Sequence, residues 1–275
     1  MTDELPVSVV MTVLEPHPRY FPEAVASVLA QTYTRWELVI VEDPSASPAG
    51  ELLRQFSDAR IHHVCNPERT SHVRQRNQSL ALARSELVAT LDADDCCHPD
   101  RLARQVAFLR EHPEIGVVGS QLAIIDAEGK RRFTRAYPCT PSGIVQAFPR
   151  YNPIAQPSVM FRKSLIQAAG GYQYERYPAV EDYDLWSRLA RRGVQFANLP
   201  DALLEYRLHQ GGMKAMRLKS ILRGTLDVKQ RYWMTALDWR GRGRLLLERL
   251  LLLVPPPLTY QLFQWTVLRR ARPSR

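Results

Sequence analysis

The sequence feature that most limits the fold is an apolar run that ends in carboxylates. Residues 87–91 read LVATL and are followed directly by Asp92-Ala93-Asp94-Asp95. A short run of this composition is typical of a strand buried in a parallel sheet. Because side chains two apart on a strand point the same way, we expect Asp92 and Asp94 to face one side together. Ligands of open α/β sheets bind beyond the carboxyl ends of the strands, so the pattern predicts a binding site here.

The spacing alone leaves two interpretations of these carboxylates open. Hard oxygen ligands suit Mg²⁺ or Mn²⁺ carrying a substrate diphosphate better than they suit zinc, which predicts a cation site. Alternatively, Asp94 and Asp95 cap a helix announced by His98-Pro99. Aspartate is a favoured helix cap, and proline is favoured at an early helical position.

The rest of the first 210 residues alternates strand patterns with helix patterns. Strands are predicted over residues 7–14, 36–41, 61–64, 86–91, 115–125 and 158–161, and helices over 21–29, 71–84, 101–111 and 181–189. Residues 126–157 show no clear period and are predicted to be loops with short strands at most. Strands separated by helices predict an α/β protein with a mostly parallel sheet, right-handed crossovers and helices on its faces.

The first half of the sequence has no glycine-rich phosphate loop of the GxGxxG or GxxxxGK[ST] kind. A nucleotide bound by such an architecture would then depend on a metal and on side chains, because backbone amides are not arranged around its phosphates. Acidic strand ends at Glu42-Asp43 and at residues 92–95 supply that alternative.

A second acidic stretch, Glu181-Asp182-Tyr183-Asp184, opens the predicted helix at 181–189. Asp182 falls on the same helical face as the apolar positions 185, 186 and 189, so it is expected to face inward. Asp184 and Arg188 are expected to pair on the wetter side. An inward carboxylate in the first turn either serves the helix terminus or faces a cleft, and both interpretations are open.

The positive charge is concentrated in the last part of the chain. The formal net charge is +9, yet residues 214–275 hold fourteen Lys and Arg against three acidic residues, which leaves −2 for residues 1–213. This segment is leucine-rich and helical in pattern, with interruptions expected at Gly241, Gly243 and Pro255, and a further helical stripe over residues 260–268. Its apolar run over 245–254 is too short to cross a bilayer, which needs about 20 residues. We therefore predict contact with an anionic membrane surface or packing on protein, including a homodimer, and no nucleic-acid partner.

The four cysteines predict no metal cage or disulfide framework. None of Cys65, Cys96, Cys97 and Cys139 forms a CxxC spacing, and the adjacent pair has poor geometry for a structural bridge. The first residues lack a basic segment followed by an apolar one. These features predict a cytoplasmic protein with reduced thiols, peripheral at the inner face of the membrane if the tail binds lipid.

Taken in order, these motifs make the chain similar to family two glycosyltransferases of the inverting type. The resemblance spans about residues 5–210 and is carried by residues 7–15, Glu42-Asp43, Arg76-Asn77, Asp92-Ala93-Asp94-Asp95, Gly170-Gly171-Tyr172, residues 181–186 and Tyr206-Arg207-Leu208-His209. It implies a Rossmann-like GT-A fold in residues 1–213, followed by a helical extension over 214–275. In residues 12–15, Thr-Val-Leu-Glu stands where the family has Pro-Thr-Tyr-Asn, which removes an aromatic side chain near the base.

The resemblance also implies a role for each matching residue. Asp182 would be the general base, and Asp94 would hold Mn²⁺ or Mg²⁺ with help from His209. A nucleotide sugar, UDP-linked by this resemblance, would be bound by Thr12, Glu15, Asp43, Arg76, Asn77, Asp92, Ala93 and Asp94, and the acceptor side would be formed by Gly171, Tyr172, Glu181 and Trp186. A hydroxyl of a saccharide or lipid-linked acceptor would receive the sugar during synthesis of a surface polysaccharide or glycolipid.

Two rival functions remain. A nucleotidyltransferase of similar fold also uses acidic strand ends and Mg²⁺, but it would have a basic, glycine-rich loop after the first strand, and residues 15–20 supply none. A catalytically inert homologue that binds membranes or scaffolds partners through the basic tail is the non-enzymatic alternative.

Overall fold

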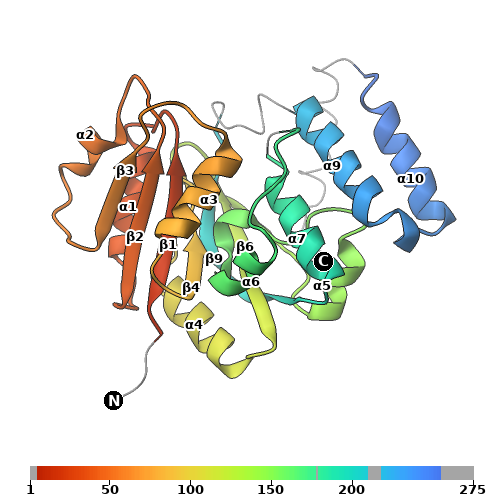
Figure 1. Ribbon diagram of the computed structural model, residues 1–275, viewed down its shortest axis with the longest axis horizontal. Helices are drawn as coiled ribbons and strands as arrows, with labels where there is room; N and C mark the ends of the chain where they lie inside the picture. Colours follow the sequence, from red (N-terminus) through yellow and green to blue (C-terminus); the bar gives the residue numbers. More distant parts are fainter. Residues whose placement is uncertain (1–4, 178, 210–217, 255–275) are drawn as a thin grey trace.

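The computed structural model describes residues 5–177, 179–209 and 218–254 (Figure 1). Its strands are β1 (Val7–Val13), β2 (Trp36–Glu42), β3 (Ile61–Cys65), β4 (Leu87–Thr90), β5 (Cys96–Cys97), β6 (Ile115–Ile125), β7 (Arg131–Arg135), β8 (Met160–Arg162) and β9 (Gln195–Arg207). Its α-helices are α1 (Tyr20–Leu29), α2 (Ala49–Leu53), α3 (His72–Leu82), α4 (Arg101–Glu111), α5 (Pro141–Ala147), α6 (Lys163–Ala168), α7 (Glu181–Arg191), α9 (Leu218–Tyr232) and α10 (Trp239–Leu250).

One sheet organises these elements, with strand order β3-β2-β1-β4-β8-β6-β9-β5 and β7 paired to β6. The first four strands are parallel, as the alternation of strands and helices predicts. Beyond β4 the sheet is mixed, because β8 runs antiparallel to both β4 and β6 while β9 runs parallel to β6. The carboxyl ends of β1, β2 and β4 therefore lie at one edge, where the acidic residues were expected.

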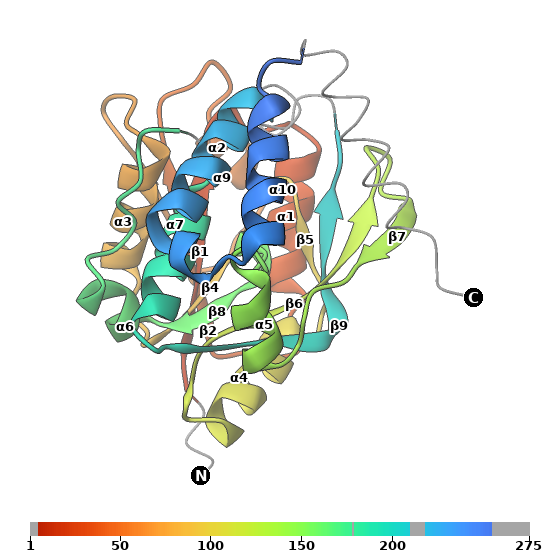
Figure 2. The same ribbon diagram turned by 90° about the vertical axis from the view of Figure 1, so that its right-hand side faces the viewer.

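Helices cover both faces of the sheet, which confirms the α/β architecture. Alternate residues of β1 point to opposite faces: Val9 and Met11 join the core beneath α1, α2 and α4, and Val10 joins the core beneath α3 and α7. Figures 1 and 2 show α1 on one side of the sheet, with α3, α6, α7 and the α9–α10 pair on the other. Because both faces of β1 are covered, each of its side chains has to be small or apolar.

A buried arginine at the start of α4, Arg101, stabilises the end of β4 through hydrogen bonds to backbone carbonyls. Its guanidinium Nη2 donates to the carbonyls of Thr90, at 2.8 Å, and Val159, at 3.1 Å. Its Nε donates to Gln105 Oε1 at 3.1 Å. Hydrogen bonds to several acceptors make burial of this cation tolerable and fix the strand end that carries the acidic turn.

Two sequence predictions about secondary structure were wrong. Residues 126–157 contain the helix α5, where Thr140 caps the first turn by accepting the Gly143 amide at 3.3 Å and Pro141 occupies the first helical position. Gly241 and Gly243 do not interrupt the C-terminal helix, because α10 runs through both. The domain boundary expected at 213–214 and the stripe at 260–268 lie outside the described residues.

The helix pair α9–α10 is joined to the main body through α7. Val228 of α9 and the neighbouring Trp233 belong to the core cluster that contains Trp186 of α7. Lys229 of α9 pairs with Glu248 of α10 at 2.7 Å. None of the helices in the described part of the chain is long and apolar enough to span a bilayer.

Candidate functional site

The acidic turn after β4 brings together residues that are distant in the sequence. Nε2 of His209 lies 2.8 Å from Asp94 Oδ2, although the two residues are 115 positions apart. Asp95 is buried and accepts the backbone amide of Arg207 at 2.9 Å. The helix α4 begins only at Arg101, so Asp94 and Asp95 do not cap it, and the capping interpretation is wrong. The two residues predicted to hold a metal, Asp94 and His209, are thus in contact, and their binding of a cation stays a prediction.

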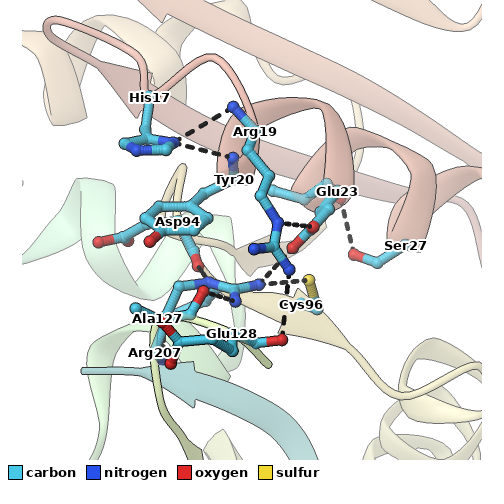
Figure 3. Close-up of polar contacts among 12 residues, drawn as sticks. His17, Arg19, Tyr20, Glu23, Ser27, Asp94, Cys96, Ala127, Glu128 and Arg207 are labelled. Atoms are coloured by element: carbon cyan, nitrogen blue, oxygen red, sulfur yellow. Dashed lines mark hydrogen bonds and ion pairs between the residues drawn. The ribbon is translucent and has the colours of Figure 1, made fainter. Parts of the chain in front are cut away.

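Arg207, at the end of β9, contacts both the acidic turn and the helix α1 (Figure 3). Its Nε donates to the carbonyl of Asp94 at 3.0 Å, and its Nη2 lies 2.6 Å from Glu23 Oε2. The guanidinium carbon stands 4.5 Å from the centre of the Tyr20 ring. Sequence reasoning placed Arg207 in a motif but gave it no role, since these contacts join segments more than 100 residues apart.

An aromatic stack lies next to the acidic turn. The His17 ring stacks on Tyr20 at 3.7 Å, and Figure 3 shows the Tyr20 ring between His17 and Arg207. The His209 ring lies 5.2 Å from the Tyr20 ring. Burial, with the nearby positive charges of Arg19 and Arg207, holds the pKa of His17 below its ordinary value. The residues after β1 therefore supply rings here even though Thr12–Glu15 has none.

A pocket of about 630 Å³ opens against this stack. It is lined by Glu15, Pro16, His17, Pro18, Tyr20, Ala46, Ser47, Ala127 and His209. Glu15 adopts a left-handed φ of 52°, which turns the chain sharply after β1. Because the pocket lies between the ends of β1 and β2 and reaches His209, it adjoins the carboxylates of the acidic turn.

Arg76 of α3 connects the acidic turn to the second acidic stretch. Its Nη2 lies 3.6 Å from Asp92 Oδ1, and its Nε donates to Glu181 Oε1 at 3.1 Å. Burial works to lower the pKa of Arg76, but the carboxylates of Glu181 and Asp92 outweigh it and hold the pKa above its ordinary value. One permanent cation is thus shared by Asp92, which follows β4, and Glu181, which begins α7.

His72, one turn before Arg76, was not predicted to contribute. Its Nε2 lies 3.1 Å from Thr12 Oγ1 and its Nδ1 lies 3.4 Å from Glu181 Oε1. Burial, with the positive charge of Arg76, lowers the pKa of His72 to about 4, so the ring is neutral at pH 7. Burial works to raise the pKa of Glu181, but His72 and Arg76 hold that pKa below its ordinary value. At neutral pH the positive charge comes from Arg76, because the His72 ring is neutral there.

Asp182 stands half-buried at the start of α7, beside the Arg76 cluster. Its Oδ2 accepts Nδ2 of Asn152 at 3.0 Å, and its Oδ1 accepts the Tyr183 amide at 2.7 Å. Asp182 also contributes to the electrostatic field that raises the pKa of Arg76. Asp92 and Asp182 therefore both lie near Arg76. The convergence of Asp94 and Asp182 on one pocket, which was the main expectation from the sequence, stays a prediction.

The Gly170-Gly171-Tyr172 turn is fixed by Asn77. The Asn77 amide donates to the Tyr172 carbonyl and accepts the Tyr172 N–H, each at 2.8 Å. Gly171 has a φ of 70°, and a Cβ there would meet Asn77 Oδ1 at 2.5 Å. Asn77 therefore positions the turn, and its contact with a nucleotide stays a prediction. The Tyr172 hydroxyl accepts Gln156 Nε2 at 2.7 Å.

Two residues of α7 are placed differently from expectation. Trp186 is fully buried in the core against Phe161 and Phe196, so it has no surface with which to contact an acceptor. Asp184 is 2% exposed and does not lie on a wetter face, because α9 covers it. It accepts Arg188 Nε and the Tyr232 hydroxyl, each at 2.8 Å.

The acidic pair at the end of β2 is buried and hydrogen-bonded. Asp43 Oδ1 accepts Asn66 Nδ2 at 2.7 Å, and its Oδ2 accepts the Thr70 amide at 2.7 Å. Glu42 accepts the Ala49 amide at 2.6 Å and lies 2.8 Å from His63 Nε2. These bonds order the loops that follow β2 and β3, and the contact of Asp43 with a nucleobase stays a prediction.

The donor set at the acidic turn fits a divalent cation that is also bound by substrate. Within residues 5–177, 179–209 and 218–254, no group of three or more His, Cys, Asp or Glu side chains could hold a metal by itself. Asp94 and His209 offer one carboxylate and one imidazole, with Asp92 two positions away. Mg²⁺ and Mn²⁺ are commonly held by one or two protein ligands together with phosphate oxygens and water.

Comparison with known sequences shows a consistent similarity. A profile described as "Glycosyl transferase family 2" matches residues 8–170. The chain is 31% identical over 205 residues to EpsE of Bacillus subtilis, which is described as a glycosyltransferase, covering 73% of this chain and 72% of that protein. It is 37% identical over 131 residues to the amylovoran biosynthesis glycosyltransferase AmsE of Erwinia amylovora, covering 48% of each. It is 28% identical to the O-antigen biosynthesis glycosyltransferase WbnJ of Escherichia coli, covering 74% and 80%.

Solved structures share the fold at low sequence identity. S. aureus TarS residues 1–349 in complex with UDP-GlcNAc superposes with a TM-score of 0.66 at 17% identity, covering 90% of this chain and 72% of that one. The mannosyltransferase PcManGT of Pyrobaculum calidifontis, in complex with GDP-Man and Mn²⁺, superposes with a TM-score of 0.65 at 18% identity, covering 94% and 72%.

Proposed function

Because the chain belongs to glycosyl transferase family 2, we propose that it moves a sugar from a nucleoside diphosphate donor to an acceptor hydroxyl with inversion at the anomeric carbon. The observation that carries this proposal is the bridge made by Arg76, which ties Asp92 of the acidic turn to Glu181, next to Asp182. In this proposal Arg76 thereby holds the donor side and the acceptor side next to each other.

In this proposal Asp182 is the general base. Its carboxylate takes the proton of the acceptor hydroxyl while the acceptor oxygen attacks the anomeric carbon, and the bond from that carbon to the diphosphate oxygen breaks with its electron pair. Attack from the face opposite the leaving group inverts the configuration. Asn152 orients the carboxylate through its hydrogen bond to Oδ2.

Asp94 and His209 would hold Mn²⁺ or Mg²⁺, and a bound cation would supply charge stabilisation for the departing diphosphate. Arg76 adds a fixed positive charge at the same edge, preorganised by its two carboxylate partners. Such preorganised charge is expected to be the largest electrostatic contribution to catalysis. The pocket beside His17 and Tyr20 is our candidate for the nucleotide, and a UDP-linked sugar is the first donor to test.

The acceptor is proposed to be a saccharide or a lipid-linked saccharide, and the product part of a surface polysaccharide or glycolipid. The named functions of AmsE and WbnJ, amylovoran and O-antigen biosynthesis, support this class. For the helical extension after residue 213, contact with an anionic membrane surface and contact with a second copy are both proposals, as is a location at the inner face of the membrane.

Release of nucleoside diphosphate from UDP- and GDP-sugars with Mn²⁺ tests the assignment. We expect Asp94→Asn to weaken Mn²⁺-dependent stabilisation of the protein by the nucleotide sugar, measured as a thermal shift. We expect Asp182→Asn to keep that shift and to lower turnover by about 10²- to 10⁴-fold, the usual contribution of a general base.

Asp100→Asn, at an exposed position before α4, is the matched control and should change neither quantity. Diphosphate release that survives Asp182→Asn and Asp94→Asn equally well would refute the site assignment.

A further inference from the structure

The outer face of α10 carries large apolar side chains in contact with solvent. Trp239, Leu246 and Leu250 recur at intervals of seven and four residues, so they share one side of the helix. They are 76%, 60% and 56% exposed, and the adjacent Leu247 is 65% exposed. Single exposed leucines are ordinary on protein surfaces, but a continuous stripe of them marks an interaction surface.

The opposite side of α10 is already used to pack against α9. Leu245 is buried, and Glu248 pairs with Lys229 of α9 at 2.7 Å. Figures 1 and 2 show α9 lying between α7 and α10, with α10 outermost. The apolar stripe therefore points away from the body of the protein.

Arginines border the stripe on both sides. At 100° per residue, Arg242 and Arg249 fall on one edge of the stripe, while Arg240 and Arg244 fall on the other, and all four are exposed. The acidic residues of α10 and its N-cap already have partners of their own. Asp238 accepts the Gly241 amide at 2.8 Å, and Glu248 pairs with Lys229 and with Arg244. The outward face is therefore apolar at its centre and cationic along both margins.

We propose that this face of α10, formed by Trp239, Leu246, Leu247 and Leu250 with the four bordering arginines, binds in the plane of an anionic lipid surface. Leucines and a tryptophan enter the boundary between headgroups and acyl chains, while long arginine side chains reach lipid phosphates at each margin. A second copy is a poorer partner, because a two-fold contact through the same face would set arginine margins against one another. Lipid phosphates have the complementary charge.

Membrane contact through α10 would also orient the proposed chemistry. The α9 helix that carries α10 is bonded to α7 through Tyr232 and Asp184, and Trp233 donates to Ser187 at 2.9 Å. Since α7 begins with Glu181 and Asp182, a lipid surface bound at α10 has a fixed relation to the proposed base. This suits a lipid-linked acceptor and rests in that respect on the proposed function, whereas the binding itself does not.

Sedimentation with vesicles tests this surface without any turnover. The full chain is expected to sediment with vesicles of phosphatidylglycerol mixed with phosphatidylcholine and not with pure phosphatidylcholine, and added salt should weaken the binding. The double variant Leu246→Ser/Leu250→Ser should bind about tenfold more weakly or worse, with an unchanged thermal midpoint. Arg240→Gln/Arg242→Gln should weaken binding and reduce its salt dependence.

Matched controls are Leu82→Ser, an exposed leucine of α3, and Arg110→Gln, an exposed arginine of α4, and both should bind as the unaltered chain does. Unchanged sedimentation of the leucine variant, or equal binding to neutral vesicles, would overturn the proposal. It would also be overturned if the leucine variant converted a dimer to a monomer in light scattering. A lowered thermal midpoint without loss of vesicle binding would show that protein covers this face.

Discussion

At the scale of single residues, the site depends on cations that each serve two carboxyl-bearing segments. Arg76 joins Asp92 to Glu181, and Arg207 joins the turn at Asp94 to Glu23 of α1. Both side chains are almost completely buried, so neither can exchange its partners for water. A buried guanidinium that contacts two partners through different nitrogens fixes distance as well as charge, which lysine does not do equally well.

The first residue-scale prediction concerns Arg207. Replacing it with Ala should lower the affinity for Mn²⁺ in the presence of UDP by about tenfold or more, because residues that orient a metal ligand commonly contribute that much. Arg207→Lys keeps the positive charge but loses the planar guanidinium, so its Mn²⁺ affinity should lie between that of the natural chain and that of Arg207→Ala. Titration calorimetry measures the affinity directly.

Arg19→Ala is the control for Arg207, since Arg19 also pairs with Glu23, at 2.9 Å, but lies on the exposed side and bonds to Glu128 instead of to the acidic turn. An Arg207→Ala protein that binds Mn²⁺ normally and only melts earlier would show a purely structural role.

The second residue-scale prediction concerns pH and His72. Its pKa in the folded protein is about 4, below the ordinary value of 6.5, so between these values the unfolded chain binds more protons than the folded one. The contribution of His72 to stability is therefore complete above pH 6.5 and is lost as the pH falls toward 4. We expect a loss on the order of 1–2 kcal/mol, less than the full shift would give because the ring is partly exposed.

Urea unfolding at several pH values from about 7.5 down to 4.5 measures this effect. His72→Gln should flatten the pH dependence of the unfolding free energy in that range. His112→Gln, at an exposed position, should leave the dependence as it is. Parallel curves for the natural chain and His72→Gln would contradict the prediction.

At the scale of elements, long periodic segments were predictable and short or tertiary-dependent ones were not. The bounds of α4 and β6 agree with the sequence prediction, because α4 keeps a helical apolar period and β6 is a long, mostly apolar run that is buried throughout. The helix α5 was missed although Thr140-Pro141 is a readable start signal, because the segment is short. Asp184 was assigned to a wet face because a helix wheel cannot show that another helix covers it.

The prediction at this scale is that Asp184 secures α9 to α7. Asp184→Ala would leave Arg188 and the Tyr232 hydroxyl without their shared acceptor in a buried place. Breaking a buried pair from one side commonly costs about 3 kcal/mol, and we expect a loss of unfolding free energy of this size. Urea denaturation measures it.

Glu111→Ala, at the exposed end of α4, should change the unfolding free energy by less than about 0.5 kcal/mol and serves as the control. If Asp184→Ala proved as mild as this control, the contact between α7 and α9 would not depend on that carboxylate.

At the scale of the whole molecule, the α/β class, the family and the sheet edge at which the acidic strand ends gather were all predictable, because they follow from local patterns in a fixed order. The GT-A fold implied by the resemblance is confirmed by the solved structures that superpose on the chain. The long-range contacts that fix the turns of the candidate site and orient Asp182 were not predictable. Arg207, Asn152 and Asn77 act on partners 30 to 113 positions away, and no local pattern announces such a contact.

The position of β9 has a consequence for the order in which a newly made chain can mature. The short strand β5 pairs only with β9 among the described strands, and the residues that follow in β9 and just after it clamp the acidic turn. During synthesis the parallel half, β1 to β4, leaves the ribosome long before residue 205 does. A nascent chain can thus complete its parallel half while the acidic turn still lacks its contacts with Arg207 and His209, and it gains them only when β9 pairs with β6 and β5.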